Sequence, residues 1–404
     1  MIHQPPAGAR DLLPLEVAQK TWISERLRQV FQRWGYQRII TSTLESLDTL
    51  MAGGAIERST VMQLRDNAEG TLGLRPELTA SISRASANQM AGSTYPQRLY
   101  YTANVFRRDS GQHHGRQVEF YQAGVELLGA GGHLADGEVL LLLHDCLRSL
   151  DLGDWYLVLG NAGLTNYLLS PFPEAIRQKV RHCISHLDYV ALSQLPLTEE
   201  LQHRAMLLFD LRGQPADVLQ KVAALDLDSE GMGMVNNLKS LVSLIEESCG
   251  GALPLILDLS LLQTIDYYTG IVFEVVSVQD NTTRILGQGG RYDKLLELYH
   301  PQQKGAPGIG FALSLDDLHS CLLNTSKLPQ ETLASDWLVI PQTPLAEVAA
   351  FTYAQKLRDS EPLVRVELEL TGNSPEQIRE YARNRRLKRL AWVQEDGVPV
   401  VEEL

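Results

Sequence analysis

The chain has 404 residues, of which 44% are hydrophobic and 21% charged, and its formal net charge is -13. This composition is typical of a globular protein of two or three domains, and its acidic balance gives no support to tight nucleic-acid binding, which uses basic surface. The sequence has no run of about 18 apolar residues, so it predicts no membrane span. Its N-terminus has no apolar core, so it predicts no signal peptide. Its four cysteines form no CxxC pair, so we expect reduced thiols in a cytoplasmic protein without a metal site.

The predicted elements alternate from the start of the chain. Apolar residues at helical spacing predict a helix over residues 15–34, and the segment YQRIIT predicts a strand. Strand and turn signals alternate from about Leu72 to Leu128, and a helix and a strand follow in DGEVLLLLHDCLRSL and WYLVLG. Residues from about 164 to 250 have a helical pattern, and strands resume at Leu255 and end near GIGFALSLDDL.

The polar segment NTSKLPQETLAS predicts a linker. Beyond it, short strand and helix patterns alternate to the end of the chain, which predicts a small α/β unit. We therefore expect one domain over residues 1–325, with a helical insertion at about 164–250, and a second domain over residues 326–404.

Four stretches place polar side chains at predicted strand ends. The segment LRPELT carries Arg75, Glu77 and Thr79 two residues apart, which predicts one face of a strand. The three others are FRRDSGQHHGRQVEFYQAGVELLG, IDYYTG and GQGGRYDKL, the last read as a Gly-rich turn. If they converge on one cavity, their carboxylates, amides and phenols suit a small zwitterion that also carries a hydrogen-bonding ring.

Taken in this order, these stretches resemble histidyl-tRNA synthetase and its relatives over about residues 1–323. The pair DYYTG…FE and GGRYD resembles the part of that family that recognises histidine. The resemblance implies an α+β fold with a class II aminoacyl-tRNA synthetase-like antiparallel sheet flanked by helices. It also implies a helical insertion and a truncated anticodon-binding-like α/β domain at the C-terminus.

The resemblance also assigns roles to residues. Glu77, Thr79 and Gln122 would hold the α-ammonium of histidine, and Glu126 and Tyr268 would meet its imidazole. A carboxylate facing a ring N–H rejects apolar rings of the same shape, because they leave the acid unpaired. The full set implied to bind histidine is Glu77, Thr79, Arg107, Gln122, Glu126, Tyr267, Tyr268, Gly289, Gly290, Arg291 and Tyr292.

The sequence departs from the synthetase pattern where adenylation needs arginines. Arg107 stands at the phosphate-binding position of the second class II signature, but the acid two residues later is Asp109 instead of glutamate. Gln263 and Asp317 occupy positions where the family has arginine. A carboxylate facing ATP phosphates would repel them. We therefore expect histidine binding without activation, no catalytic residue and no cofactor.

A sequence that keeps the histidine-binding residues and lacks the adenylating arginines resembles the synthetase-like regulatory subunits of ATP phosphoribosyltransferase. This resemblance implies a short-form catalytic subunit of that enzyme as the partner and L-histidine as the effector. It also implies a homodimer within a hetero-oligomer, with no membrane contact and with tRNA binding unlikely.

Three alternatives remain open at this point. A divergent, active histidyl-tRNA synthetase would need arginine at Gln263 and Asp317. A phosphoribosyltransferase is suggested by TIDYYTG, which superficially resembles the loop that binds phosphoribosyl pyrophosphate in such enzymes. In those enzymes the loop opens a helix, whereas here its glycine leads into a predicted strand. The third alternative is a non-enzymatic synthetase-like module with another role, which the sequence alone distinguishes poorly from a regulatory subunit. The basic stretch from Arg379 to Arg389 could be a leftover RNA contact or a helix C-terminus favoured by the macrodipole.

Overall fold

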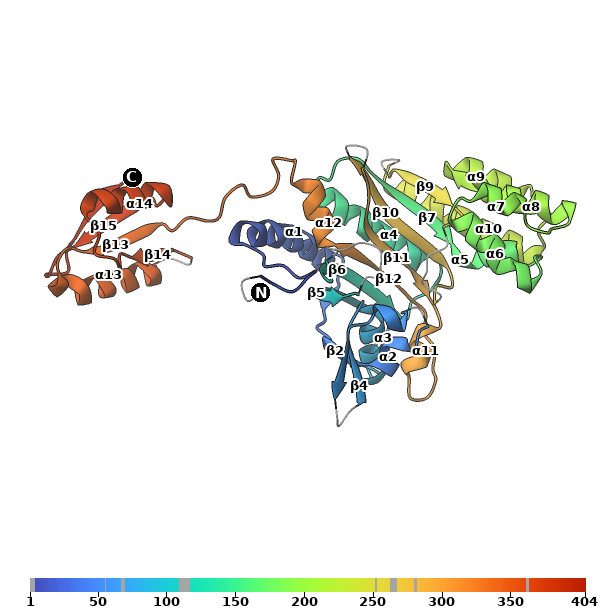
Figure 1. The fold of residues 1–404 in the computed structure, drawn as a ribbon, viewed down its shortest axis with the longest axis horizontal. Helices are drawn as coiled ribbons and strands as arrows, with labels where there is room; N and C mark the ends of the chain where they lie inside the picture. Colours follow the sequence, from blue (N-terminus) through green and yellow to red (C-terminus); the bar gives the residue numbers. More distant parts are fainter. Residues whose placement is uncertain are drawn as a thin grey trace. The chain divides into compact units, whose positions relative to one another are not determined.

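The computed structural model describes residues 4–54, 56–66, 70–108, 117–250, 253–261, 267–279, 282–360 and 363–404. The chain forms two compact units, divided between Pro329 and Gln330. In the first unit, the described residues form a nine-stranded sheet (Figure 1). Its strands, in spatial order, are β1 (Gln37–Arg38), β5 (Gln97–Phe106), β6 (Glu119–Leu128), β12 (Gly308–Ser314), β11 (Thr282–Tyr292), β10 (Ile271–Gln279), β7 (Trp155–Asn161), β9 (Leu255–Asp258) and β8 (Arg212–Gly213).

The centre of this sheet is antiparallel. From β5 through β6, β12, β11 and β10 to β7, each adjacent pair of strands is antiparallel. β1 pairs parallel with β5, and β9 pairs parallel with β7. Helices flank the sheet, as predicted, and the class II antiparallel architecture is confirmed.

Three helices, α1 (Pro14–Arg33), α4 (Gly132–Ser149) and α12 (Leu315–Leu322), cover one face of the sheet (Figure 1). In α1, Ile23, Leu27 and Val30 recur at a spacing of three to four residues, so one stripe of the helix is apolar and fully buried. This stripe packs in one core cluster with inward-facing residues of the sheet such as Val125 and Phe311.

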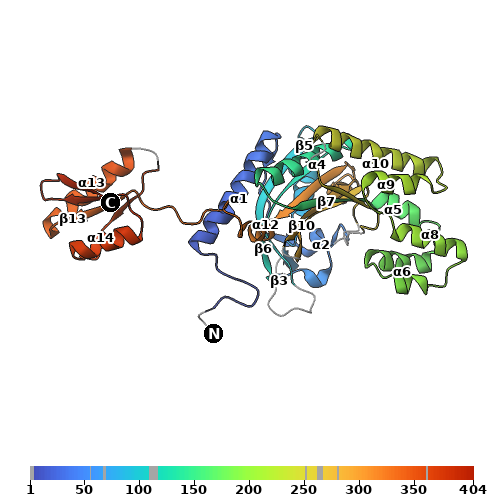
Figure 2. The same ribbon diagram turned by 90° about the horizontal axis from the view of Figure 1, so that it is seen from above.

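Along the chain, a run of helices separates β7 from β9, which pair side by side in the sheet, and several of these helices gather at one end of the sheet (Figure 2). It consists of α5 (Ala162–Leu169), α6 (Glu174–Ser185), α7 (Tyr189–Ser193), α8 (Glu199–Phe209), α9 (Pro215–Ala223) and α10 (Ser229–Ser248). Side chains of Asp188, Thr198 and Asp228 accept backbone N–H groups at the starts of α7, α8 and α10. These caps fix where three of the helices begin.

The other face of the sheet carries smaller elements and leaves room for a site. These are α2 (Leu47–Met51), α3 (Thr79–Asn88), α11 (Leu295–Tyr299) and a small sheet of β2 (Leu44–Ser46), β4 (Gly70–Leu74) and β3 (Gln63–Asp66). A second core cluster joins Leu78 and Ile82 to Tyr101, Tyr292 and Leu295. It anchors α3 and α11 beside the strands that carry polar side chains.

The second unit is an α/β domain with strand order β14-β13-β15-β16. It consists of β13 (Trp337–Pro341), α13 (Glu347–Ser360), β14 (Val366–Leu368), α14 (Pro375–Asn384), β15 (Arg389–Val393) and β16 (Pro399–Glu403). Its basic stretch is paired with acids within the unit, including Arg379–Glu402 at 2.7 Å and Lys388–Asp336 at 2.7 Å. Cations so neutralised are poorly placed to attract a phosphate backbone.

None of the helices in the described ranges combines the length and the apolar character needed to cross a bilayer.

Candidate functional site

A cavity of about 730 Å³ opens on the face of the sheet that carries α3. Its walls come from β6, β11, β12 and the turn before α3, and the described residues that line it include Glu77, Thr79, Tyr101, Arg107, Gln122, Glu126, Tyr267, Tyr268, Gln288, Tyr292, Gly310 and Asp317. Most of the residues predicted from sequence therefore meet in one place, although they come from segments far apart in the chain.

Glu126 is the deepest acid of this cavity, with only 2% of its surface exposed. Its Oε1 accepts a hydrogen bond from Thr79 Oγ1 at 2.7 Å, and its Oε2 accepts one from the Tyr292 hydroxyl. Burial raises the pKa of Glu126 to about 8, although these two donors oppose the shift. A buried carboxyl with so high a pKa favours a ligand that brings a positive charge or an N–H group.

Two glycines of β12 make room for this arrangement. A Cβ on Gly310 would lie 2.1 Å from Glu126 Oε2, and one on Gly308 would lie 2.3 Å from the Tyr292 ring. Neither glycine was predicted to be part of the site. The signal was present, because glycines at alternate positions of a strand mark a close approach on one face.

Glu77 and Thr79 line the cavity, but the prediction that they share a face of a strand is wrong. β4 ends at Leu74, Pro76 follows, and Thr79 is the first residue of α3. The Glu77 carboxylate accepts the backbone N–H of Thr79 and that of Ala80, the latter at 2.9 Å, which satisfies free donors of the first helical turn. Burial raises the pKa of Glu77, while these hydrogen bonds and Arg107 act against the rise.

Arg75, from the same stretch, does not line the cavity. Its guanidinium donates to the carbonyl oxygens of Asn104, Thr41 and Ser42 at 2.9 to 3.1 Å and so fastens the turn to its neighbours. Arg107 does line the cavity, and its Nε donates to the carbonyl of Pro76 at 2.8 Å.

Gln122 lies on the same face of β6 as Glu126, as expected for residues four apart in a strand. Its Oε1 is buried and has no hydrogen-bond partner among the described residues. A buried acceptor left unsatisfied costs free energy, which a ligand N–H group would recover. Gln122 is thus the clearest vacant acceptor in the cavity.

Tyr267 and Tyr268 close the side of the cavity next to β11. Their rings meet edge to face with centroids 5.1 Å apart, and the Tyr267 ring lies 5.7 Å from that of Tyr292. A Cβ on Gly290 would lie 2.7 Å from the Tyr268 ring, so this glycine permits the approach of Tyr268.

The expected Gly-rich turn at residues 289–292 is part of strand β11, and this changes the role of two residues. Because side chains alternate along a strand, Tyr292 faces the cavity while Arg291 points to the opposite face. There Arg291 is 6% exposed and pairs with Asp136 of α4, to which its Nε donates at 2.8 Å. Gly289 also faces away, toward Phe273. The prediction that Arg291 and Gly289 close the pocket is therefore wrong.

Asp317, one of the substituted synthetase positions, lines the outer part of the cavity. It lies in the first turn of α12, where its backbone N–H donates to Ser314 Oγ at 3.2 Å, and Arg284 approaches its carboxylate to 3.9 Å. Asp109 and Gln263, the other two substituted positions, lie outside the described residues.

The charge of the cavity favours a cation over a polyphosphate. The lining has four acids, Glu57, Glu77, Glu126 and Asp317, against two described guanidiniums, those of Arg107 and Arg108. Because its pKa is raised to about 8, Glu126 is largely uncharged at neutral pH until a cationic ligand stabilises its ionised form. A triphosphate would meet repulsion at this lining, whereas a ligand with an ammonium and a ring N–H would find acceptors.

The lining residues not predicted from the sequence include Tyr101 of β5 and Gln288 of β11. Tyr101 is 2% exposed, and a Cβ on Gly124 would lie 2.5 Å from its hydroxyl. Strand alternation could have placed Gln288 with Tyr292, but nothing in the local sequence distinguishes Tyr101 from a core tyrosine.

Comparison with known proteins agrees with this geometry. The family model described as histidyl-tRNA synthetase matches residues 8–318. The chain is 66% identical over 405 residues to the ATP phosphoribosyltransferase regulatory subunit of Gloeothece citriformis (strain PCC 7424), covering 100% of this chain and 99% of that one. It is 60% identical over 404 residues to the subunit of the same name from Nostoc sp. PCC 7120, covering 100% of both.

Two solved structures support the fold. An ATP phosphoribosyltransferase regulatory subunit/histidyl-tRNA synthetase from Bacillus halodurans C is 29% identical, with a TM-score of 0.80 over 94% of this chain and 97% of that one. Histidyl-tRNA synthetase from Nostoc sp. PCC 7120 is 19% identical, with a TM-score of 0.78 over 99% of this chain and 97% of that one. At this identity the similarity supports the fold only. The chain therefore belongs to the family of ATP phosphoribosyltransferase regulatory subunits, which share the fold of histidyl-tRNA synthetase.

Proposed function

We propose that this chain binds L-histidine in the cavity around Glu126 and transmits feedback control to a short-form catalytic subunit of ATP phosphoribosyltransferase, without catalysing a reaction itself. The observation that carries the proposal is the buried, unsatisfied Gln122 Oε1 in the same cavity as the half-buried Glu77 and the buried Glu126. Histidine offers matching groups, an α-ammonium for Glu77 and Gln122 and a ring N–H for Glu126.

The proposal includes assembly of the chain as a homodimer within a cytoplasmic hetero-oligomer. The four free cysteines fit a reducing compartment. In Nostoc sp. PCC 7120, a regulatory subunit similar to this chain coexists with a separate histidyl-tRNA synthetase. Such a division of labour supports a role for this chain other than charging tRNA.

The decisive experiment mixes the purified chain with the cognate short catalytic subunit. A joint peak on size-exclusion chromatography and phosphoribosyl transfer to ATP that histidine inhibits are expected. If histidine prefers the inhibited arrangement, the coupling should be about 1–3 kcal/mol, or roughly 5- to 150-fold in affinity.

The matched variants are Glu126→Ala, in the cavity, and Glu246→Ala, which removes an exposed acid of α10. Glu126→Ala should abolish inhibition and leave assembly intact, whereas Glu246→Ala should change neither. The proposal would be contradicted if no complex formed. It would also be contradicted if histidine did not change the activity of the complex that contains the parent chain.

A further inference from the structure

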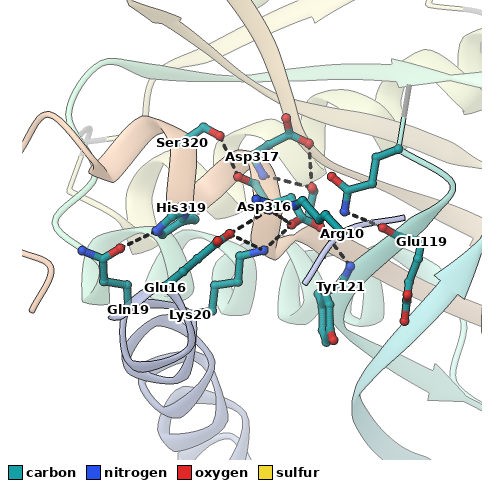
Figure 3. Close-up of polar contacts among 12 residues, drawn as sticks. Arg10, Glu16, Gln19, Lys20, Glu119, Tyr121, Asp316, Asp317, His319 and Ser320 are labelled. Carbon is teal, nitrogen blue, oxygen red and sulfur yellow. Dashed lines mark hydrogen bonds and ion pairs between the residues drawn. The ribbon is translucent and has the colours of Figure 1, made fainter. Parts of the chain in front are cut away.

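A partly buried ion network lies behind the cavity, where the N-terminal segment, α1, β6 and α12 meet (Figure 3). Lys20 Nζ donates to Asp316 Oδ1 at 2.5 Å, and both side chains are largely buried, with exposed fractions of 8% and 13%. Arg10 reaches the same carboxylate at 3.4 Å, and Glu16 pairs with Arg10 at 2.8 Å and with Lys20 at 3.4 Å. Two cations thus balance two anions.

The second oxygen of Asp316 holds strand β6 itself. Oδ2 accepts the backbone N–H of Tyr121 at 3.0 Å. β12 ends at Ser314, opposite Gln122, so no strand residue remains on that side to accept this N–H. The carboxylate of Asp316 therefore adds one more hydrogen bond to the ladder between β6 and β12. Lys20, whose Nζ lies 5.4 Å from the centroid of the Tyr121 ring, holds the carboxylate in place.

The residue after Tyr121 is Gln122, whose side chain points to the other face of β6 and into the cavity. The direction of its vacant Oε1 depends on where the backbone of β6 lies at this point. Asp316 and Asp317 are neighbours in the first turn of α12, but only Asp317 lines the cavity.

We propose that Asp316, held by Lys20, is a positioning residue that fixes β6 so that Gln122 presents its amide oxygen to the α-ammonium of the ligand. This inference rests on the proposed histidine binding and adds a residue outside the cavity that sets ligand specificity. Asp316 does not touch the ligand. Its contribution is confined to the ammonium end, because Glu126 is held separately by Thr79 and Tyr292.

The test measures binding by calorimetry of two probes, L-histidine and imidazolepropionate, which lacks the α-ammonium. Asp316→Ala should weaken histidine binding about 10-fold and leave imidazolepropionate binding unchanged. Asp316→Asn keeps an oxygen that can accept the Tyr121 N–H, so it should recover most of the histidine affinity despite any loss of stability. In a Gln122→Ala background, Asp316→Ala should cause no further loss.

The control is Glu45→Ala, which breaks another buried ion pair, with Arg84 at 2.7 Å, outside the cavity. It should lower stability without changing the ratio of the two affinities. If Asp316→Ala does not fold, Lys20→Met supplies the same comparison, because it removes the shorter of the two ion pairs that hold Asp316 and should weaken histidine binding selectively.

Equal weakening of both probes, full additivity with Gln122→Ala, or no effect of any Asp316 or Lys20 variant would overturn the positioning role while leaving histidine binding intact. A parent chain that does not bind histidine would instead overturn the proposed function, and this inference with it.

Discussion

Glu126 of β6 and Tyr292 of β11 are joined by a hydrogen bond that passes over the strand between them. β12 separates the two, and its residues facing them are Gly310, paired with Glu126, and Gly308, paired with Tyr292. Because neither position carries a side chain, the backbone of β12 is uncovered there, and the acid and the phenol can meet above it.

Gly310→Ala should therefore destroy the site. The new Cβ would lie 2.1 Å from Glu126 Oε2 and 2.4 Å from the carbonyl oxygen of Val125, so both the side chain and the strand would have to move. We expect a loss of about 1–3 kcal/mol in the free energy of unfolding, and loss of histidine binding in calorimetry. Gly305→Ala is the control, because its Cβ would make only ordinary contact with Glu297 at 3.6 Å.

Glu126→Ala should weaken histidine binding by about 2 kcal/mol or more, the scale for losing a charged partner in a buried site. Calorimetry on this variant and on Glu246→Ala separates loss of the acceptor from a general loss of charge. Equal affinity of Glu126→Ala and the parent would remove Glu126 from the histidine site.

The stability of the ligand-free chain should depend on pH through Glu126. The folded carboxyl has a pKa raised to about 8 by burial, whereas an unfolded glutamate titrates near pH 4.3. Between about pH 4.3 and about pH 8 the folded state binds more protons, so its stability falls as pH rises, by up to about 1.4 kcal/mol per pH unit.

Glu126→Gln removes this titration, since an amide does not ionise. The advantage of the variant in unfolding free energy should grow from about pH 5 to about pH 8, as measured by denaturant melts without histidine. A constant difference across this range would show that Glu126 does not titrate as its burial requires.

Arg291→Met should destabilise the fold without affecting the ligand. The change leaves Asp136 as a buried, unpaired acid between β11 and α4, which costs about 3–5 kcal/mol in comparable cases. The double variant Arg291→Met, Asp136→Leu should recover much of this loss in denaturant melts. Histidine affinity of the folded single variant should match the parent; a selective loss of affinity would return Arg291 to the site.

The isolated chain should not catalyse histidine-dependent exchange of pyrophosphate into ATP. Adenylation needs positive charge around the developing charge on the phosphate, and Asp317 supplies a negative one in the outer cavity. Gln263→Arg alone should not restore exchange, because Asp317 is still present. Exchange by protein free of contaminating synthetase, measured beside an authentic histidyl-tRNA synthetase, would revive the synthetase alternative.

Local sequence patterns determined the elements and much of the site. The apolar spacing of residues 15–34 predicted the helix that the structure has as α1, and the spacing of four residues between Gln122 and Glu126 is enough to put both on one face of β6. These inferences succeeded because helix and strand periodicity depend only on backbone geometry, which acts within a few residues.

Only the tertiary structure decided how these residues are used. Pro76 ends the extended stretch, so the Glu77 carboxylate satisfies the start of α3 and does not lie on a strand with Thr79. Arg291 and Tyr292 are adjacent in sequence, but the register of β11 sends one to Asp136 and the other to Glu126. Register, pairing partners and the depth of burial depend on segments hundreds of residues apart, and a sequence pattern carries no direct record of those contacts.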